Sequence, residues 1–195
     1  MFKYYNQKKR VSRSAHEIYG SIVAQTRMPI FYADWRVPDT VEGRFEVLVL
    51  HMALVICRLN EGTQDGSREL GRKVAEAFID DLDGSFREMG VGDLAVPKRM
   101  KTASEAYYGR LRAYGGSLGE VSGAGLADAL KRNILSDEEL RSVNVAAIAD
   151  YMLRSSHVLA EIEIEEINNG HVEFANFHRE GNDMRLAGGD GDEQI

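Results

Sequence analysis

The segment from Thr40 to Asn60 constrains the fold more than any other part of the chain, because it is apolar on nearly every side. The valines in it are compatible with a strand, but its length and the polar residues Arg58 and Asn60 favour a helix. A helix that is apolar nearly all round must be buried. We therefore expect this helix at the centre of the fold. Its apolar positions are Phe45, Val47, Leu48, Val49, Met52, Leu54, Val55 and Ile56.

Helical periodicity continues on both sides of this segment. Ser14 is expected to cap a first helix, and residues 28–38 to form an ordered loop between two prolines. Gly90 ends a predicted helix over 67–89, and Pro97 opens another that Gly115 and Gly116 end at Tyr114. A short helix covers 126–134, and Ser136 with Glu139 forms a capping box that starts a long final helix. No pair of alternating strands is visible, so the fold class is all-α.

Composition sets the domain organisation. Hydrophobic residues make up 44% of the 195 positions and charged residues 28%, which is typical of a soluble globular protein. We expect a basic N-terminal arm over 1–13, one compact helical domain over 14–180 and a flexible acidic tail over 181–195. The single cysteine, Cys57, excludes an internal disulfide and fits a reducing compartment. No apolar run is long enough to span a bilayer, and the first residues do not form a secretory signal.

The sequence contains motifs that resemble catalytic ones in the wrong structural context. Residues 115–119 match the G-x-S-x-G nucleophile elbow and residues 90–95 match a dinucleotide-binding fingerprint, but both motifs require a preceding strand. His51 on an apolar helix is expected to be a core residue, and His157 with Glu161 is too small a set for a metal site. We therefore expect a protein that is not an enzyme, with no catalytic residue, no metal and no cofactor.

Two other functions stay open from the residues alone. Asp80, Asp81 and Asp83 could attract a cation, as in a metal-dependent hydrolase, although a solvated helix face is the better interpretation. The basic residues before Glu17 could serve a ribosome-associated or RNA-associated binding module. The net charge of −7 argues against DNA as a partner of the whole chain.

Between Tyr19 and Tyr114 a series of unusual blocks resembles the ubiquinol–cytochrome c chaperone family. The order and approximate spacing of the blocks carry the resemblance. They are Ala24-Gln25-Thr26-Arg27, Pro29, Phe31, Tyr32, Val37-Pro38-Asp39-Thr40, Gly43-Arg44-Phe45, Leu50-His51, Asp80-Asp81-Leu82-Asp83, residues 87–93, Lys98 and Tyr108-Gly109-Arg110.

The resemblance implies an assembly factor that binds newly made or unassembled cytochrome b and promotes assembly of the ubiquinol–cytochrome c reductase complex. A small helical partner protein and the ribosome are further partners implied by the family. Because no presequence is visible, the resemblance points to a bacterial relative in the cytoplasm, peripheral at the inner face of the inner membrane.

A client rich in membrane helices needs an apolar surface with a polar rim. For contact with client or partner we propose the aromatic residues of the 28–38 loop and the arginines of the matching blocks, namely Phe31, Tyr32, Trp35, Arg27, Arg44, Arg87 and Arg110. The alternatives are that the rings cap the core and that the arginines pair with Asp39, Asp81 or Glu88. For weak contact with an anionic membrane we propose Lys8, Lys9, Arg10, Arg13, Lys98, Arg99 and Lys101.

Overall fold

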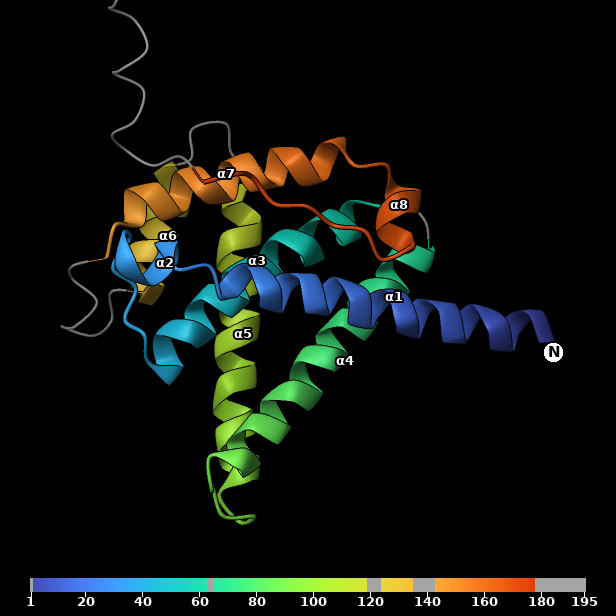
Figure 1. Ribbon diagram of the computed structural model, residues 1–195, viewed down its shortest axis with the longest axis horizontal. Helices are drawn as coiled ribbons and strands as arrows, with labels where there is room; N and C mark the ends of the chain where they lie inside the picture. The colour runs from blue at the N-terminus through green and yellow to red at the C-terminus, as the bar shows by residue number, and fades with distance from the viewer. Residues whose placement is uncertain (1, 63–64, 119–123, 135–142, 178–195) are drawn as a thin grey trace, which may run out of the picture.

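In the computed structural model, residues 2–62, 65–118, 124–134 and 143–177 are described, and they form helices and no strand (Figure 1). This confirms the all-α fold class. The helices are α1 (Phe2–Thr26), α2 (Ile30–Ala33), α3 (Val41–Glu61), α4 (Asp65–Glu88), α5 (Val96–Leu118), α6 (Ala124–Ile134), α7 (Val145–Glu161) and α8 (Ile164–Asn168). None of these helices combines the length and the apolar content needed to cross a bilayer.

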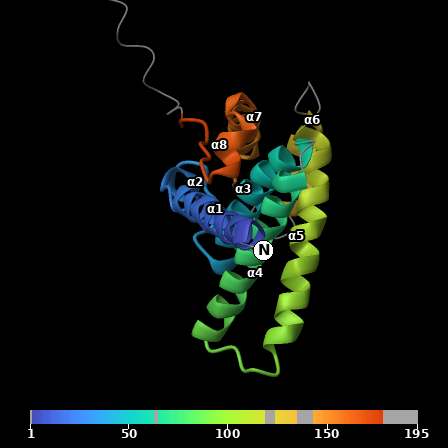
Figure 2. The same ribbon diagram turned by 90° about the vertical axis from the view of Figure 1, so that its right-hand side faces the viewer.

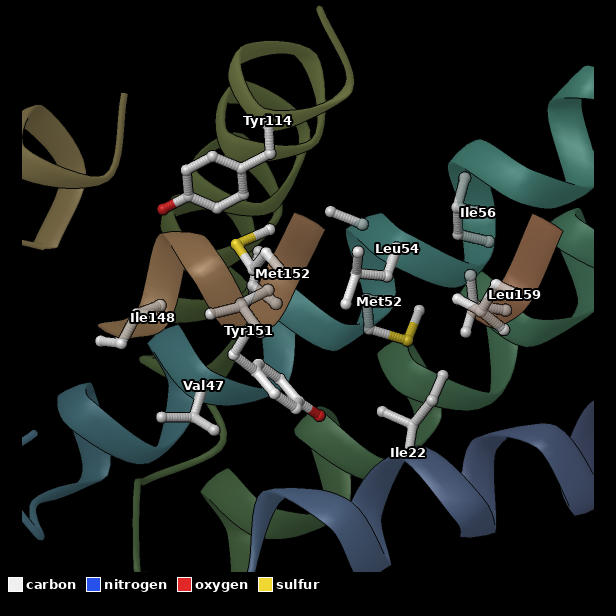
Figure 3. Close-up of a cluster of buried hydrophobic side chains, with 14 of the residues drawn as sticks. Ile22, Val47, Met52, Leu54, Ile56, Tyr114, Ile148, Tyr151, Met152 and Leu159 are labelled. Atoms are coloured by element: carbon white, nitrogen blue, oxygen red, sulfur yellow. The ribbon is translucent and has the colours of Figure 1, made fainter. Parts of the chain in front are cut away.

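Helix α3 lies at the centre, as its apolar composition predicts, and α1, α4, α5 and α7 all pack against it. Close to Thr40, its N-cap, the backbone N–H of Gly43 donates to the threonine hydroxyl. Near its other end, Arg58 donates to the carbonyls of Leu159 and Ile162 and so binds the C-terminal end of α7. Figure 3 shows the core around it, where side chains of α1, α3, α5 and α7 meet.

Helices α4 and α5 form a hairpin whose connecting loop lies at the end of the molecule away from α7 (Figure 2). Gly90 has a φ of +76° and follows the last turn of α4, which confirms its predicted role as a helix stop. Helix α1 packs against α4 and extends beyond it at its N-terminal end (Figure 1). This arrangement leaves one face of the hairpin facing the C-terminal part of α1 and the N-terminal part of α3.

Tertiary contacts overturn two predicted helix ends. Ser14 lies inside α1 and is buried, because Gly170 passes directly beside it, so it is not an N-cap. Helix α5 continues through Gly115 to Leu118, and a Cβ at Gly115 would come within 2.9 Å of the sulfur of Cys57. The glycine therefore permits close packing of α5 on α3 and does not end the helix.

The final helix also begins later than predicted. Helix α7 starts at Val145, with Asn144 as its N-cap, and the side-chain oxygen of Asn144 accepts from the N–H of Ala147 at 3.1 Å. The proposed capping box at 136–139 and the proposed tail over 181–195 lie outside the described residues. Within the predicted 28–38 loop, residues 30–33 form the short helix α2.

After α8 the chain runs back along α7 as an extended segment, residues 171–177 (Figure 1). Two hydrogen bonds hold it to α7. The N–H of Ala175 donates to the hydroxyl of Ser155 at 3.2 Å, and Arg154 donates to the carbonyl of Asn176 at 2.6 Å. Phe174 and Phe177 pack onto the core from this segment, so residues far apart in the sequence close one side of the domain.

Candidate functional site

The aromatic residues expected to bind a client are largely buried. Phe31 has no exposed surface and Trp35 only 6%, and their rings meet edge to face at a centroid distance of 5.1 Å. Phe31 also contacts Tyr151 and Phe177 at 5.5 and 5.4 Å. This geometry corresponds to the alternative in which the rings complete the core. In this conformation neither Phe31 nor Trp35 can touch a client directly.

His51 lies in the same cluster, and each of its two ring nitrogens has a hydrogen-bond partner. Gln25 donates to the hydroxyl of Tyr151 at 3.0 Å, and that hydroxyl lies 2.8 Å from Nε2 of His51. Nδ1 lies 2.7 Å from the carbonyl of Val47, so the consistent arrangement has Nδ1–H donating to this carbonyl and Nε2 accepting from Tyr151. Burial lowers the pKa of His51 to about 4, which keeps the ring neutral. This histidine is a structural residue.

An apolar groove of about 940 Å³ lies between α4 and α5, with the C-terminal end of α1 and the N-terminal half of α3 beside it. Its large apolar side chains come from α3 and α4, and small side chains of α5 face them. The large residues include Phe45, Leu48, Phe78, Leu82 and Phe86, with Met89 directly after α4, and the small ones are Thr102, Ala103 and Ala106, with Ala95 directly before α5.

The groove continues into apolar side chains that the fold leaves exposed. Val41 and Met89 line it and are 53% and 48% exposed. Met28, the chain neighbour of the lining residue Arg27, is 40% exposed. Solvated apolar side chains gathered around an apolar groove are typical of a surface that binds another apolar segment.

Three of the four proposed client-binding arginines line this groove, and two of these three are paired. Arg110 donates through Nε to Glu46 at 2.5 Å and through a second nitrogen to its other carboxylate oxygen. Burial nevertheless raises the pKa of Glu46, because desolvation outweighs the attraction of Arg110. Arg44 donates to Asp39 at 2.5 Å, which agrees with the predicted pairing. Arg27 forms no ion pair with another described residue.

Arg87 and Tyr32 lie outside the groove lining. Arg87 pairs with Asp83 and Asp93, at 2.7 and 2.8 Å, and not with the expected Asp81 or Glu88. Tyr32 is half-buried, donates its hydroxyl to the carbonyl of Thr26 at 2.7 Å, and lies under the guanidinium of Arg44. Tyr32 therefore packs against the guanidinium of Arg44, which lines the groove.

The acidic cluster considered for a metal site is divided among other partners. Asp81 accepts a hydrogen bond from the hydroxyl of Tyr19 at 2.8 Å, and Asp83 binds Arg87. Across the described residues no group of three histidine, cysteine or carboxylate side chains is gathered in a way that could hold a metal ion. This arrangement favours the interpretation of Asp80, Asp81 and Asp83 as a helix surface.

The residues proposed for membrane contact fall on two separate helices. Lys9, Arg10 and Arg13 are exposed on α1, where Arg13 lies 3.4 Å from Glu17. The side chain of Lys8 lies outside the described part of the structure. On α5, Lys98, Arg99 and Lys101 are exposed, and the first two of them also line the groove.

Sequence reasoning missed the groove because its residues look like core residues. Phe45, Leu48, Phe78 and Phe86 have the spacing of buried helix positions. Phe78 and Phe86 are indeed buried although they line the groove, whereas Phe45 and Leu48 are only partly buried. One signal was present in the sequence. The face of α5 opposite these residues carries Ala103 and Ala106, which are too small to fill the space between two helices.

Comparisons with known proteins agree with this architecture. Residues 33–174 match the family model described as ubiquinol-cytochrome C chaperone. The ubiquinol-cytochrome c reductase complex assembly factor 1 of Drosophila melanogaster is 27% identical over 113 residues, covering 56% of this chain and 44% of that protein. The protein of the same name from Mus musculus is 22% identical over 161 residues, covering 82% and 54%. The chain thus spans about half the length of these relatives.

A solved structure extends the likeness to nearly the whole chain. The crystal structure of the Cbp3 homolog from Brucella abortus superposes with a TM-score of 0.77 at 34% sequence identity. The match covers 90% of this chain and 96% of that one.

Proposed function

Because the chain belongs to the ubiquinol-cytochrome c chaperone family, we propose that it binds newly made cytochrome b and promotes assembly of the ubiquinol–cytochrome c reductase complex. The family is one of assembly chaperones for this complex, and the fly and mouse relatives are named as its assembly factors. A chaperone needs a surface that binds exposed apolar segments and releases them, and it needs no catalytic group. The groove beside α4 and α5 has the character of such a surface.

The groove carries this proposal. Its apolar walls and the exposed side chains of Val41 and Met89 suit the membrane-spanning segments of an unassembled client. In this proposal Arg27 and Arg44 contact the client at the rim, and Tyr32 holds Arg44 in place. Arg110 shapes the wall through Glu46, while Phe31 and Trp35 support the segment that carries Tyr32 from the core.

The place of action follows from the client. Cytochrome b is inserted into the membrane as it is made, so the chaperone acts at the inner face of that membrane. A small helical partner protein and the ribosome belong to this proposal as expectations from the family resemblance. The match to a bacterial structure supports a bacterial setting.

A capture experiment with two charge substitutions tests the groove. Met89 lines it, whereas Leu94 lies five residues further along the chain and is not among the lining residues. Leu94 is almost fully exposed and Met89 about half exposed, and neither belongs to the buried core, so neither substitution should disturb it. Tagged wild type and Leu94→Glu should retain cytochrome b from cells that are making it, and Met89→Glu should retain several-fold less, since a carboxylate in an apolar groove must be desolvated.

The same variants can be examined in a strain that lacks the gene. We expect this strain to contain less assembled reductase while other respiratory complexes persist, and we expect Leu94→Glu but not Met89→Glu to restore it. Normal reductase levels in the deletion strain would contradict the chaperone function. Equal loss of cytochrome b with both variants would place the client on the loop and not in the groove.

A further inference from the structure

We infer that the groove holds its client as an apolar α-helix that lies along α5 and runs antiparallel to it. This inference rests on the proposed function and specifies the conformation and direction of the bound segment. It follows from the shape of the α5 wall, from the lack of backbone partners in the groove and from the charges at one end.

The α5 wall has the form of a helix-packing surface. The lining residues of α5 are Lys98, Arg99, Thr102, Ala103, Ala106 and Arg110, which recur at intervals of three and four and so follow one face. At its middle this face carries only small side chains. Small residues allow two helix backbones to approach closely, and large side chains opposite them fill the remaining space. Large apolar side chains of a client helix would fill the space between this face and the partly buried Phe45 and Leu48 of α3.

The hydrogen-bonding capacity of the groove excludes an extended client segment. An extended backbone needs partners for its N–H and C=O groups, and a buried group without one is costly. The described residues contain no strand whose edge could supply a row of such partners, and the groove lies between helices, whose own backbone groups are already paired. A helix satisfies its own backbone groups, as it does in a membrane.

The length of the groove also suits a helix. From Lys98 to Arg110 the α5 face covers 12 residue steps, which corresponds to about 18 Å, or just over three helical turns. A membrane-spanning helix has about 20 apolar residues and a length of about 30 Å. Such a helix would extend beyond the groove at the loop end, where the lining residue Met89 is exposed.

The basic residues at the end of the groove near the α4–α5 loop determine the direction of the bound helix. Lys98 and Arg99 lie in the first turns of α5, where the positive end of the helix dipole disfavours them, and no acidic residue accompanies them there. Neither residue forms an ion pair with another described residue, and Glu88 is the acidic lining residue closest in the chain. The C-terminal end of a bound helix is negative, so it is favoured beside Lys98 and Arg99. The bound helix then runs antiparallel to α5.

Labelled peptides added to the full chain test both parts of the inference. The first peptide is a 15-residue leucine–alanine helix with two glutamates at its C-terminal end. The second has the two glutamates at its N-terminal end, and the third is the first with two central prolines. By fluorescence anisotropy we expect the first to bind at least about fivefold more tightly than the second. The third should bind at least about tenfold more weakly than the first, because proline breaks the helix.

Variants assign the binding to the groove. Thr102→Trp, at an exposed position on the rim, and Ala106→Phe, deeper in the groove, should both abolish binding of the first peptide. Ala146→Phe, on the exposed face of α7, is the matched control and should have no effect. Lys98→Glu with Arg99→Glu should reverse the preference between the first two peptides.

The outcomes distinguish this inference from the proposed function. If the proline peptide binds as tightly as the first, the groove accepts irregular segments, and the inferred helical conformation of the client is wrong. If the preference between the first two peptides is absent, or does not reverse in the Lys98→Glu/Arg99→Glu variant, the direction is wrong. Failure of all peptides with capture of cytochrome b intact overturns the inference alone, and failure of both overturns the proposed function as well.

Discussion

His51 and its hydrogen-bond partners make the stability of this protein depend on pH. The ring is fully buried, and the rings of Phe31, Tyr151 and Phe174 surround it. Its pKa in the folded chain is about 4, against an ordinary value of 6.5 in the unfolded chain. Between these values the unfolded state binds a proton that the folded state does not bind. The contribution to stability is therefore complete above pH 6.5 and is lost as the pH falls towards 4.

We predict that this single group lowers the free energy of unfolding by about 2–3 kcal/mol between pH 7.5 and pH 4.5. Urea unfolding of wild type and His51→Gln at several pH values measures the effect. Glutamine can donate to the carbonyl of Val47 and accept from Tyr151 without titrating. The variant should lose less stability than wild type over this interval. Parallel pH profiles for the two proteins would contradict the assignment.

At the scale of elements, the junction between the 34–40 segment and α3 depends on one glycine. A Cβ at Gly43 would overlap the carbonyl oxygen of Pro38, so the segment can cross the first turn of α3 only where the side chain is absent. The next turn carries Arg44 and Phe45, which line the groove. The shape of the groove at this end therefore depends on how closely the loop approaches the helix.

We predict that Gly43→Ala lowers the free energy of unfolding by about 1–3 kcal/mol, as for other overpacked sites. Gly20 supplies the matched control, because it lies in α1 with open space around it. Gly20→Ala should leave stability unchanged or raise it by about 0.5–1 kcal/mol, since alanine is the better helix former. Chemical denaturation of the two variants measures the difference. Equal effects would show that the contact at Gly43 is relieved without cost.

Charge is distributed unevenly over the whole molecule. The net charge is −7, yet Lys9, Arg10 and Arg13 are exposed in the N-terminal half of α1, and the N-terminal end of this helix extends from the body of the fold (Figure 1). Each basic residue near an anionic surface contributes about 1 kcal/mol, and salt screens the attraction. If the N-terminal half of α1 faced a membrane, the groove would stay accessible, because only the C-terminal end of α1 lines it.

We predict that the protein floats with vesicles containing anionic lipid at low salt and is released at several-fold higher salt. Lys9→Glu with Arg10→Glu should abolish flotation. Lys131→Glu with Arg132→Glu, which changes the charge by the same amount on α6, should not. Flotation with neutral lipid would contradict an electrostatic attachment. Loss of flotation in a Lys98→Glu/Arg99→Glu variant, with α1 intact, would assign the contact to α5.

The sequence by itself determined the features that depend on residues a few positions apart. Apolar periodicity gave the helices and placed α3 at the centre, and Thr40 and Gly90 marked helix ends correctly. The blocks between Tyr19 and Tyr114 were sufficient for the family resemblance, since each depends on local order and spacing. These signals need no knowledge of what lies opposite in space.

Only the tertiary structure decided which apolar and charged groups are available for binding. Phe31 is buried because Tyr151 and Phe177, more than a hundred residues later in the chain, cover it. Arg110 is engaged because Glu46 faces it from another helix. Phe45 and Phe86 line a groove because α4 diverges from α5 above their connecting loop. Burial and pairing depend on the partners that folding brings together, whereas the spacing of residues within a helix specifies only the face on which they lie.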